Sequence, residues 1–299
     1  MELHYYHCKR GNFGDDLNPA FFQEICPNFK KIRGNKLIGI GTLLNNSISN
    51  LNNSIVFGSG YGQGRPVDLS KTKLNILGVR GPISAMSIRH PPDSAIVIGD
   101  PALILPKLPA FNNGISATNK KKIIALHHRT AEFWDFQNSS NSDFYYLDPA
   151  GHTLNTYIET IKQADFVLAE SLHAAIIATA YGIPFIRTNL LGKVDETKWL
   201  DYYLSVNINN LPIAAPLPIP SQNPLRRVAL GLTSRKIFNQ SFQRAFCQTI
   251  PQRNIELLEL AANELIKNQK LHTPDSKAII RLQDKIMKAI DKLSILSKN

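Results

Sequence analysis

The sequence predicts an α/β fold in which parallel sheets are covered by helices, with a helical C-terminal region. Two observations lead to this fold class. Short apolar runs alternate with helical patterns over most of the chain, and this strand-then-helix order is typical of parallel sheets. Residues 166–169 form an unbroken apolar run, as expected for a strand that is buried on both faces.

The short apolar runs define the expected strands, and the segments between them define the expected helices. In the first half, strands are expected at residues 2–7, 36–40, 55–57, 74–79 and 95–98. In the second half, they are expected at residues 122–126, 144–147, 166–169, 185–187 and 203–206. Helices are expected at residues 16–25, 42–50, 81–88, 153–163 and 173–181.

Two breaks rich in proline divide the chain. Residues 101–118 carry turn-forming residues and little pattern, and residues 212–224 hold five prolines, which exclude a helix. The breaks predict an N-terminal α/β domain of residues 1–115 and a second of residues 116–215. Residues 216–299 would then form a linker and a basic helical region.

Composition indicates a globular protein from a reducing compartment. The 299 residues can bury a large core, and a hydrophobic content of 43% is ordinary for soluble domains. Three widely spaced cysteines argue against a disulfide framework. The N-terminus has no apolar signal-peptide segment, and no uncharged apolar run reaches the roughly 18 residues that span a bilayer. We therefore expect a cytoplasmic protein.

The net charge of +11 is concentrated near the C-terminus. Residues 222–299 hold 14 of the 34 lysines and arginines but only 6 of the 23 acidic residues. A basic tail on a nearly neutral body predicts a local anionic contact rather than a surface for nucleic acid. The sequence has no zinc-ligand spacing and no aromatic nucleic-acid motif, so we predict no nucleic-acid partner.

Residues 274–299 are expected to form an amphipathic helix that begins at Asp275 or Ser276. Its apolar stripe consists of Ile279, Leu282, Ile286, Ile290, Leu293 and Leu296. Its cations are Lys277, Arg281, Lys285, Lys288 and Lys292. Such a helix packs on the body or on another subunit of a homo-oligomer. The alternative is a peripheral contact with an anionic membrane surface.

The segment Gly11-Asn12-Phe13-Gly14-Asp15-Asp16 follows the first expected strand. Its glycines relax the backbone, and one aspartate can cap the next helix. A capped turn does not account for the whole motif, so we predict that it binds a ligand. No third carboxylate or histidine has useful spacing, and therefore no metal site is predicted.

Three further segments in the first half lie where strands end. Residues 58–64 contain four glycines, which let a backbone approach a ligand closely, although a flexible turn would look the same. Arg80 ends a strand just before Pro82, which favours the first position of a helix. Asp100 ends the strand before the first break and either lines the cleft or caps the following turn.

In the second half, two strands end in polar side chains. His127, His128 and Arg129 follow one strand, and three cationic groups there predict an anion site. The other strand, residues 166–169, is followed by Glu170, Ser171 and His173 at the start of a helix. In parallel sheets, ligands bind at the carboxyl ends of strands, where helix N-termini present backbone N–H groups.

These segments together resemble the polysaccharide pyruvyltransferase family over residues 2–187, in matching order. The matching residues are Gly11-Asn12-Phe13-Gly14-Asp15-Asp16, Val79-Arg80-Gly81-Pro82-Ile83-Ser84-Ala85, Gly99-Asp100-Pro101-Ala102, and Ser171-Leu172-His173 followed by Gly182-Ile183-Pro184. The resemblance implies two Rossmann-like domains that face each other across a cleft, an arrangement called GT-B. It also implies phosphoenolpyruvate as a co-substrate, with no bound cofactor. The acceptor would be a surface polysaccharide or its lipid-linked oligosaccharide precursor, and the product a cyclic pyruvate ketal.

The resemblance also implies roles for individual residues. His173 is expected to be the general acid, since imidazole can hold or release a proton near neutral pH. Asp15 is expected to orient or deprotonate an acceptor hydroxyl. The predicted donor site consists of Arg129, His128, Ser171 and Leu172. The predicted acceptor side of the cleft consists of Asn12, Asp16, Arg80 and Asp100.

One position departs from the family pattern. Many members carry an arginine before the Leu-His pair, whereas this chain has Ser171, preceded by Glu170. A subgroup that resembles succinoglycan-type pyruvyltransferases also has Glu-Ser there. Two other functions stay open. One is a GT-B glycosyltransferase using a nucleotide sugar, although its usual acidic ribose contact is missing and Glu196 is the only nearby candidate. The other is a non-catalytic glycan-binding relative.

Overall fold

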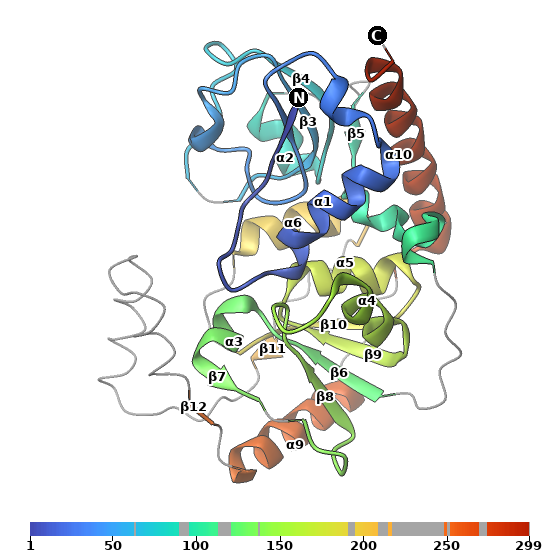
Figure 1. The fold of residues 1–299 in the computed structure, drawn as a ribbon. Helices are drawn as coiled ribbons and strands as arrows, with labels where there is room; N and C mark the ends of the chain where they lie inside the picture. The colour runs from blue at the N-terminus through green and yellow to red at the C-terminus, as the bar shows by residue number, and fades with distance from the viewer. Residues whose placement is uncertain are drawn as a thin grey trace.

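The computed structural model confirms a mixed α/β fold with parallel sheets (Figure 1). It describes residues 1–62, 64–89, 96–112, 121–136, 138–190, 195–208, 215–216, 248–249, 252–268 and 274–298. Two five-stranded sheets dominate it, one built from residues 2–98 and the other from residues 121–216. The first predicted break, residues 101–118, falls between the two sheets.

The first sheet has the strand order β1-β2-β3-β4-β5, and every neighbouring pair is parallel. Its strands are β1 (Glu2–His4), β2 (Lys36–Ile38), β3 (Ser54–Ser59), β4 (Leu74–Val79) and β5 (Val97–Ile98). Strand β3 is buried along its whole length, because it lies at the centre of the sheet with helices and loops on both faces.

The second sheet has the order β11-β10-β9-β6-β8 and is also parallel. Its strands are β6 (Lys121–Ala125), β8 (Phe144–Leu147), β9 (Ala164–Ala169), β10 (Phe185–Asn189) and β11 (Ala215–Pro216). A short parallel pair, β7 (Trp134–Asp135) with β12 (Gln248–Thr249), lies outside it. The apolar run of β9 is almost entirely buried, as its sequence predicts.

Helices connect the strands and join the two halves. They are α1 (Phe13–Ile25), α2 (Pro82–Ser87), α3 (His128–Phe133), α4 (Leu154–Lys162), α5 (Leu172–Ala180) and α6 (Glu196–Ser205). Helix α5 is apolar on nearly all sides and packs against the 3₁₀ helix η3 (Pro101–Lys107) of the first half. At the start of α1, the Phe13 ring stacks on Tyr157 of α4, with ring centroids 4.1 Å apart. One hydrophobic core therefore runs through both halves.

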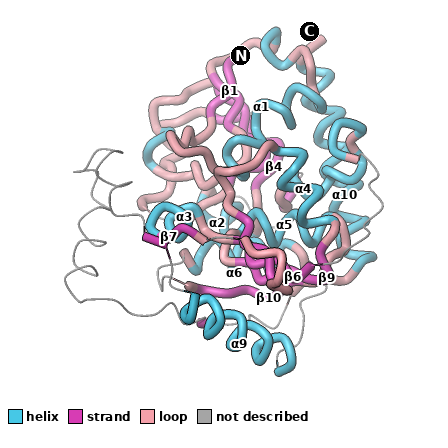
Figure 2. Tube along the Cα trace, turned by 60° about the horizontal axis from the view of Figure 1, so that its bottom comes forward, coloured by secondary structure: helices cyan, strands magenta, loops and turns pink. Residues whose placement is uncertain are grey.

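The two C-terminal helices pack on different halves of the molecule. Helix α9 (Gln252–Asn268) covers the second sheet on the face opposite α4 and α5 (Figures 1 and 2), with Ile255, Leu258 and Ala262 in its core. Helix α10 (Ser276–Leu296) returns to the first half, where it contacts β4, β5 and η3. The predicted amphipathic helix is thus confirmed, and its apolar stripe lies against the body of the protein.

Two predicted elements are wrong. Residues 203–206 end α6 and the turn after it, rather than forming a strand. Trp199, Tyr202 and Tyr203 are buried at helical spacing after the Asp195 cap, and this tertiary packing overrides the β-propensity of tyrosine. Residues 42–50 contain only a short 3₁₀ helix, η2 (Asn46–Ile48), which Asn45 caps. Their asparagines and serines favour turns over a longer helix.

Among the described residues, no helix is both long enough and apolar enough to cross a membrane.

Candidate active site

A cavity of about 390 Å³ lies between the carboxyl ends of the two sheets. Seven of the predicted site residues line it: Asn12, Asp15, Arg80, His128, Ser171, Leu172 and His173. The most distant of their loops lie 150 residues or more apart in the sequence. In a parallel sheet such loops meet, because the carboxyl ends of the strands lie at one edge of the sheet. Asp16 and Asp100 are not among the residues that line the cavity.

Asp15 is held at the start of α1 by its own motif. The Asn12 side chain donates a hydrogen bond to the Asp15 carboxylate at 2.5 Å, and the Asn12 backbone N–H donates to Asp16 at 2.7 Å. Gly11 allows the turn, because its φ of +95° is strained for other residues. The Phe13 N–H donates to the carbonyl of Pro149 at 2.9 Å, which ties this turn to the second half.

The carboxyl group of Asp15 is nearly buried, with 7% of the residue exposed. Burial raises its pKa to about 6, and the negative charge of Asp16 adds to this, whereas the Asn12 hydrogen bond and the positive charge of Lys198 act in the opposite direction. A carboxyl group with a pKa near 6 is ionised at neutral pH yet remains a useful base.

His173 lies in the first turn of α5 and packs directly on Gly14 of α1. A Cβ atom added to Gly14 would lie 1.9 Å from His173 Nδ1, so only glycine leaves room for the imidazole. Burial, together with the smaller effects of the nearby charges of Lys198 and Arg80, lowers the pKa of His173 to about 3. In the ligand-free cavity His173 is therefore neutral at pH 7.

Substituting Gly14 with alanine is expected to displace the His173 ring and to lower activity about 100-fold, since misplacing a reacting group by about 1 Å has effects of this size. Stability should fall by no more than about 1–3 kcal/mol, the usual cost of overpacking, because alanine favours a helix by about 1 kcal/mol over glycine and offsets part of the clash. Activity assays and urea unfolding of Gly14→Ala check both points. The control is Gly151→Ala, whose Cβ would meet no atom closer than 3.8 Å; an equal loss in both variants contradicts the prediction.

Glu170 is buried and organises the strand ends around the cavity. Its carboxylate accepts hydrogen bonds from the backbone N–H groups of His127 and Leu190, each at 2.9 Å. These two groups follow β6 and β10, so one side chain connects the strands on both sides of β9. Ser171, the cap residue of α5, is 8% exposed, and its side chain makes no capping hydrogen bond to the helix.

His127 and His128 line the cavity side by side, with ring centroids 4.1 Å apart. His128 begins α3, and the backbone of Arg129 continues this helix. The Arg129 side chain lies outside the described part of the structure, so its predicted contact with the donor stays a prediction.

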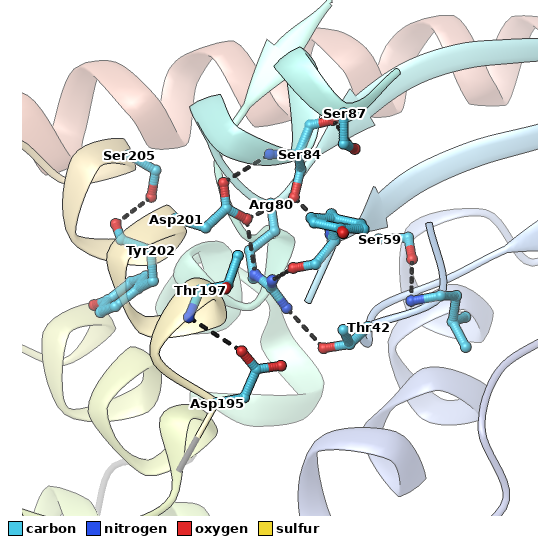
Figure 3. A network of polar contacts seen from close by, with 12 residues as sticks. Thr42, Ser59, Arg80, Ser84, Ser87, Asp195, Thr197, Asp201, Tyr202 and Ser205 are labelled. Carbon is cyan, nitrogen blue, oxygen red and sulfur yellow. Dashed lines mark hydrogen bonds and ion pairs between the residues drawn. The ribbon is translucent and has the colours of Figure 1, made fainter. Parts of the chain in front are cut away.

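Arg80 is buried in a polar network that joins the two halves (Figure 3). Its Nε donates to Asp201 of α6 at 3.1 Å, and its guanidinium also donates to Thr42 Oγ1 and to the Tyr61 carbonyl. The same Asp201 carboxylate accepts hydrogen bonds from the Ser84 N–H and hydroxyl. Arg80 thus borders the cavity, while its guanidinium N–H groups link the first half of the molecule to α6 of the second.

Replacing Asp201 with asparagine is expected to destabilise the protein by roughly 3–5 kcal/mol, because it leaves the buried Arg80 charge without its counter-ion. Urea unfolding measures the change. The control is Asp143→Asn, which removes the exposed partner of Lys122 and should alter stability by less than about 1 kcal/mol. Equal stabilities for Asp201→Asn and wild type would contradict the prediction.

Asp100 is fully buried and caps η3, where its Oδ1 accepts a hydrogen bond from the Ala102 N–H at 2.9 Å. Burial raises the pKa of Asp100 to about 6. Two roles were expected for Asp100, lining the cleft or capping the following turn, and this hydrogen bond supports the cap. Its proposed influence on the acceptor side stays a prediction.

Sequence reasoning missed seven residues that line the cavity: Tyr6, Gly41, Thr42, Leu43, Asn45, Asp195 and Lys198. Asp195 caps α6, and Lys198 lies in its first turn. The signal for α6 was present as a capping aspartate followed by buried residues at 199, 202 and 203. Within the described ranges, no group of three His, Cys, Asp or Glu side chains could hold a metal ion.

Comparison with known proteins supplies the family. The sequence model of the polysaccharide pyruvyl transferase family matches residues 4–189. The succinoglycan biosynthesis protein ExoV of Rhizobium meliloti (strain 1021) is 30% identical over 221 residues, which cover 73% of this chain and 68% of that protein. No solved structure matches the chain. The resemblance seen in the motifs is therefore confirmed: the chain is a transferase and belongs to the polysaccharide pyruvyl transferase family.

Proposed function

We propose that the protein transfers the pyruvate unit of phosphoenolpyruvate to two hydroxyl groups of a sugar and forms a cyclic ketal. One observation carries this proposal: a single cavity brings together Asp15 with a pKa near 6, His173 at the start of a helix, and several groups that can bind anions. The acceptor belongs to a surface polysaccharide or its lipid-linked precursor, in line with the name of the relative, a succinoglycan biosynthesis protein.

The second half of the molecule would hold the donor. Phosphoenolpyruvate carries a phosphate and a carboxylate, which require cations and backbone N–H groups. The N-terminus of α5, with Ser171 and Leu172 at the cavity, offers the N–H groups. His128 and, by resemblance, Arg129 would contribute hydrogen-bond donors.

The first half would hold the acceptor. Asn12 and Asp15 face the cavity from the start of α1, and Tyr6, a residue that is 59% exposed, contributes an aromatic ring. An exposed ring with a polar tip suits the mixed polar and apolar face of a sugar.

The chemistry balances with these residues. Asp15 takes the proton of one acceptor hydroxyl as its oxygen attacks C2 of phosphoenolpyruvate, and His173 gives a proton to the methylene carbon, which becomes a methyl group. The C2–O bond to phosphate then breaks. The second hydroxyl attacks C2, its proton leaves toward the departing phosphate, and the ketal closes.

We further propose the GT-B-like arrangement of two Rossmann-like domains, supported by the two parallel sheets on opposite sides of the cavity. The limits of residues 1–115 and 116–215 stay predictions. The packing of α10 on β4 and β5 supports its assignment to the N-terminal domain rather than to a separate extension.

The test is incubation with phosphoenolpyruvate and a library of oligosaccharide acceptors. We expect phosphate release that depends on the acceptor, together with a product whose mass has increased by one pyruvate ketal. A thermal shift with nucleotide sugars but none with phosphoenolpyruvate would instead favour the glycosyltransferase. Binding of phosphoenolpyruvate without turnover on any glycan would favour a non-catalytic relative.

The glycosyltransferase alternative loses its proposed ribose contact. Glu196 forms an ion pair with Arg187 at 2.6 Å, and it is not among the residues that line the cavity. Arg187 itself is buried against the Trp199 ring, 4.8 Å from its centroid. The Glu196 carboxylate thus has a structural partner that accounts for its position.

If the acceptor is lipid-linked, the enzyme works at the cytoplasmic face of a membrane, and α10 offers a surface for this contact. The apolar stripe of α10 is packed in the core, so the exposed face would meet the lipid, and Ile280 and Ile295 are exposed on this helix as well. That face carries Lys277, Arg281, Lys285, Lys288 and Lys292. The contact would therefore be mainly electrostatic. A homo-oligomer stays a prediction.

Reversing two of these charges, in Lys288→Glu/Lys292→Glu, is expected to weaken binding to vesicles with anionic lipids at least about 30-fold, because each lysine near such a surface contributes about 1 kcal/mol. Co-sedimentation measures the effect, and added salt should weaken the wild type in the same direction. Lys71→Glu/Lys73→Glu changes the same charge at two exposed lysines elsewhere and serves as the control. Equal binding by both double variants would reject α10 as the contact.

A further inference from the structure

Helix α6 brings a lysine into the cavity from outside the region that carries the family motifs. Lys198 lies in the first turn of α6 and lines the cavity, whereas the family match ends at residue 189. Neither the sequence motifs nor the family match gives this residue a role. It is half-buried and lines the cavity, and a lysine in such a place can pack its stem against protein and extend its ammonium group toward solvent.

The position of Lys198 is fixed by its neighbours on α6. Trp199 and Tyr202 are fully buried, and the Tyr202 hydroxyl bonds to Thr179 of α5 at 2.5 Å. Asp201 forms the buried ion pair with Arg80 of the first half. The helix is thus anchored to both halves within one turn of Lys198, which limits how far the lysine can move.

The charges around the cavity indicate what Lys198 can bind. The start of α5 carries an uncharged serine, Ser171, and His173 is neutral at pH 7. The guanidinium of Arg80 is already shared among Asp201, Thr42 and the Tyr61 carbonyl. Asp195, which also lines the cavity, accepts the Thr197 N–H at the cap of α6.

Lys198 also lines the same cavity as both reacting groups, Asp15 and His173. Its positive charge lowers the pKa of Asp15 and that of His173, so its field reaches both sides of the cavity. An ammonium group in that place can contact a small dianion or trianion that lies between the two residues.

We propose that Lys198 binds the anionic donor and supplies a cation that the start of α5 lacks. This inference rests on the proposed function, since its ligand is phosphoenolpyruvate. Lys198 would hold the phosphate or carboxylate during the transfer, with a contact that is charge-assisted and therefore strong.

The experiment compares Lys198→Met with Lys198→Arg and with Lys277→Met, which removes an exposed lysine of α10. Calorimetry with phosphoenolpyruvate should give a Kd at least about tenfold higher for Lys198→Met, as expected for the loss of a hydrogen bond to a charged group. Lys198→Arg should retain most of the affinity, and Lys277→Met should bind like the wild type. In turnover, KM for phosphoenolpyruvate should rise more than kcat falls.

Two results separate this inference from the proposed function. Equal affinity of the wild type and Lys198→Met overturns the role of Lys198 and leaves the proposed function intact. No binding by the wild type overturns both. A ligand-free NMR titration of His173 adds an independent readout, because removing Lys198 should raise the pKa of His173 whatever the substrate is. An unchanged pKa would show that the ammonium lies away from the cavity and would also overturn the inference.

Discussion

Replacing His173 with glutamine is expected to lower acceptor-dependent phosphate release from phosphoenolpyruvate by about 10²–10⁴-fold, the range for loss of a general acid. Glutamine keeps a polar side chain of similar length but cannot give up a proton. Steady-state assays of phosphate release measure the change. The control is His152→Gln, at a half-buried histidine outside the cavity, which should retain full activity. Full activity in His173→Gln would overturn the assignment.

The same residue should take up a proton when the donor binds. In the ligand-free cavity the pKa of His173 is about 3, so the imidazole is neutral and cannot act as an acid at pH 7. A negative charge about 4 Å away, at an effective dielectric constant near 20, stabilises the imidazolium by about 4 kcal/mol, or roughly 3 pKa units. Phosphoenolpyruvate carries more than one such charge, so binding should bring the pKa of His173 to neutrality or above.

Calorimetry in buffers with different ionisation enthalpies counts these protons. Near pH 6.5, the wild type should take up a substantial fraction of a proton for each phosphoenolpyruvate bound, and His173→Gln should take up much less. Uptake should increase as the pH rises from 5 toward 7, where free phosphoenolpyruvate becomes fully ionised and free His173 stays neutral. Identical uptake by both proteins would mean that another group receives the proton.

The sequence predicted the cavity better than it predicted the contacts inside it. Parallel topology alone brings the carboxyl ends of strands together, so the loops with Asp15, His128 and His173 could be expected to meet. The reason for Gly14 was hidden, because the imidazole that needs its space lies more than 150 residues away along the chain. Such a contact leaves no periodic pattern near either residue.

Helix α6 was not predicted, for a different reason. Its buried positions, Trp199, Tyr202 and Tyr203, follow helical spacing, but aromatic residues also favour strands, and the short window did not decide between the two. The partner of Arg80 could not be predicted either, since Asp201 is 121 residues further along the chain. For these two reasons the sequence did not reveal α6, the helix that places Lys198 at the cavity.

The pH dependence of kcat/KM is expected to show an acidic limb with a midpoint near 6, which belongs to Asp15. A general base works only when deprotonated, so activity should fall as the pH drops below the pKa of Asp15. Asp15→Asn should lower kcat/KM by about 10²–10⁴-fold and remove this limb. A limb that persists unchanged in the residual activity of Asp15→Asn would assign it to another group.

Two charged residues that affect the pKa of Asp15 provide a test in which the acidic limb of the pH profile keeps its shape but its midpoint shifts. The negative charge of Asp16 raises the pKa of Asp15, so Asp16→Asn should shift the midpoint below 6. The positive charge of Lys198 lowers the same pKa, so Lys198→Met should shift the midpoint upward. Opposite shifts in the two variants would be hard to explain by a general loss of structure, because damage to the fold has no reason to follow the sign of the removed charge. Shifts in the same direction would exclude Asp15 as the group that titrates, and the base would then have to be sought among the other residues that face the acceptor.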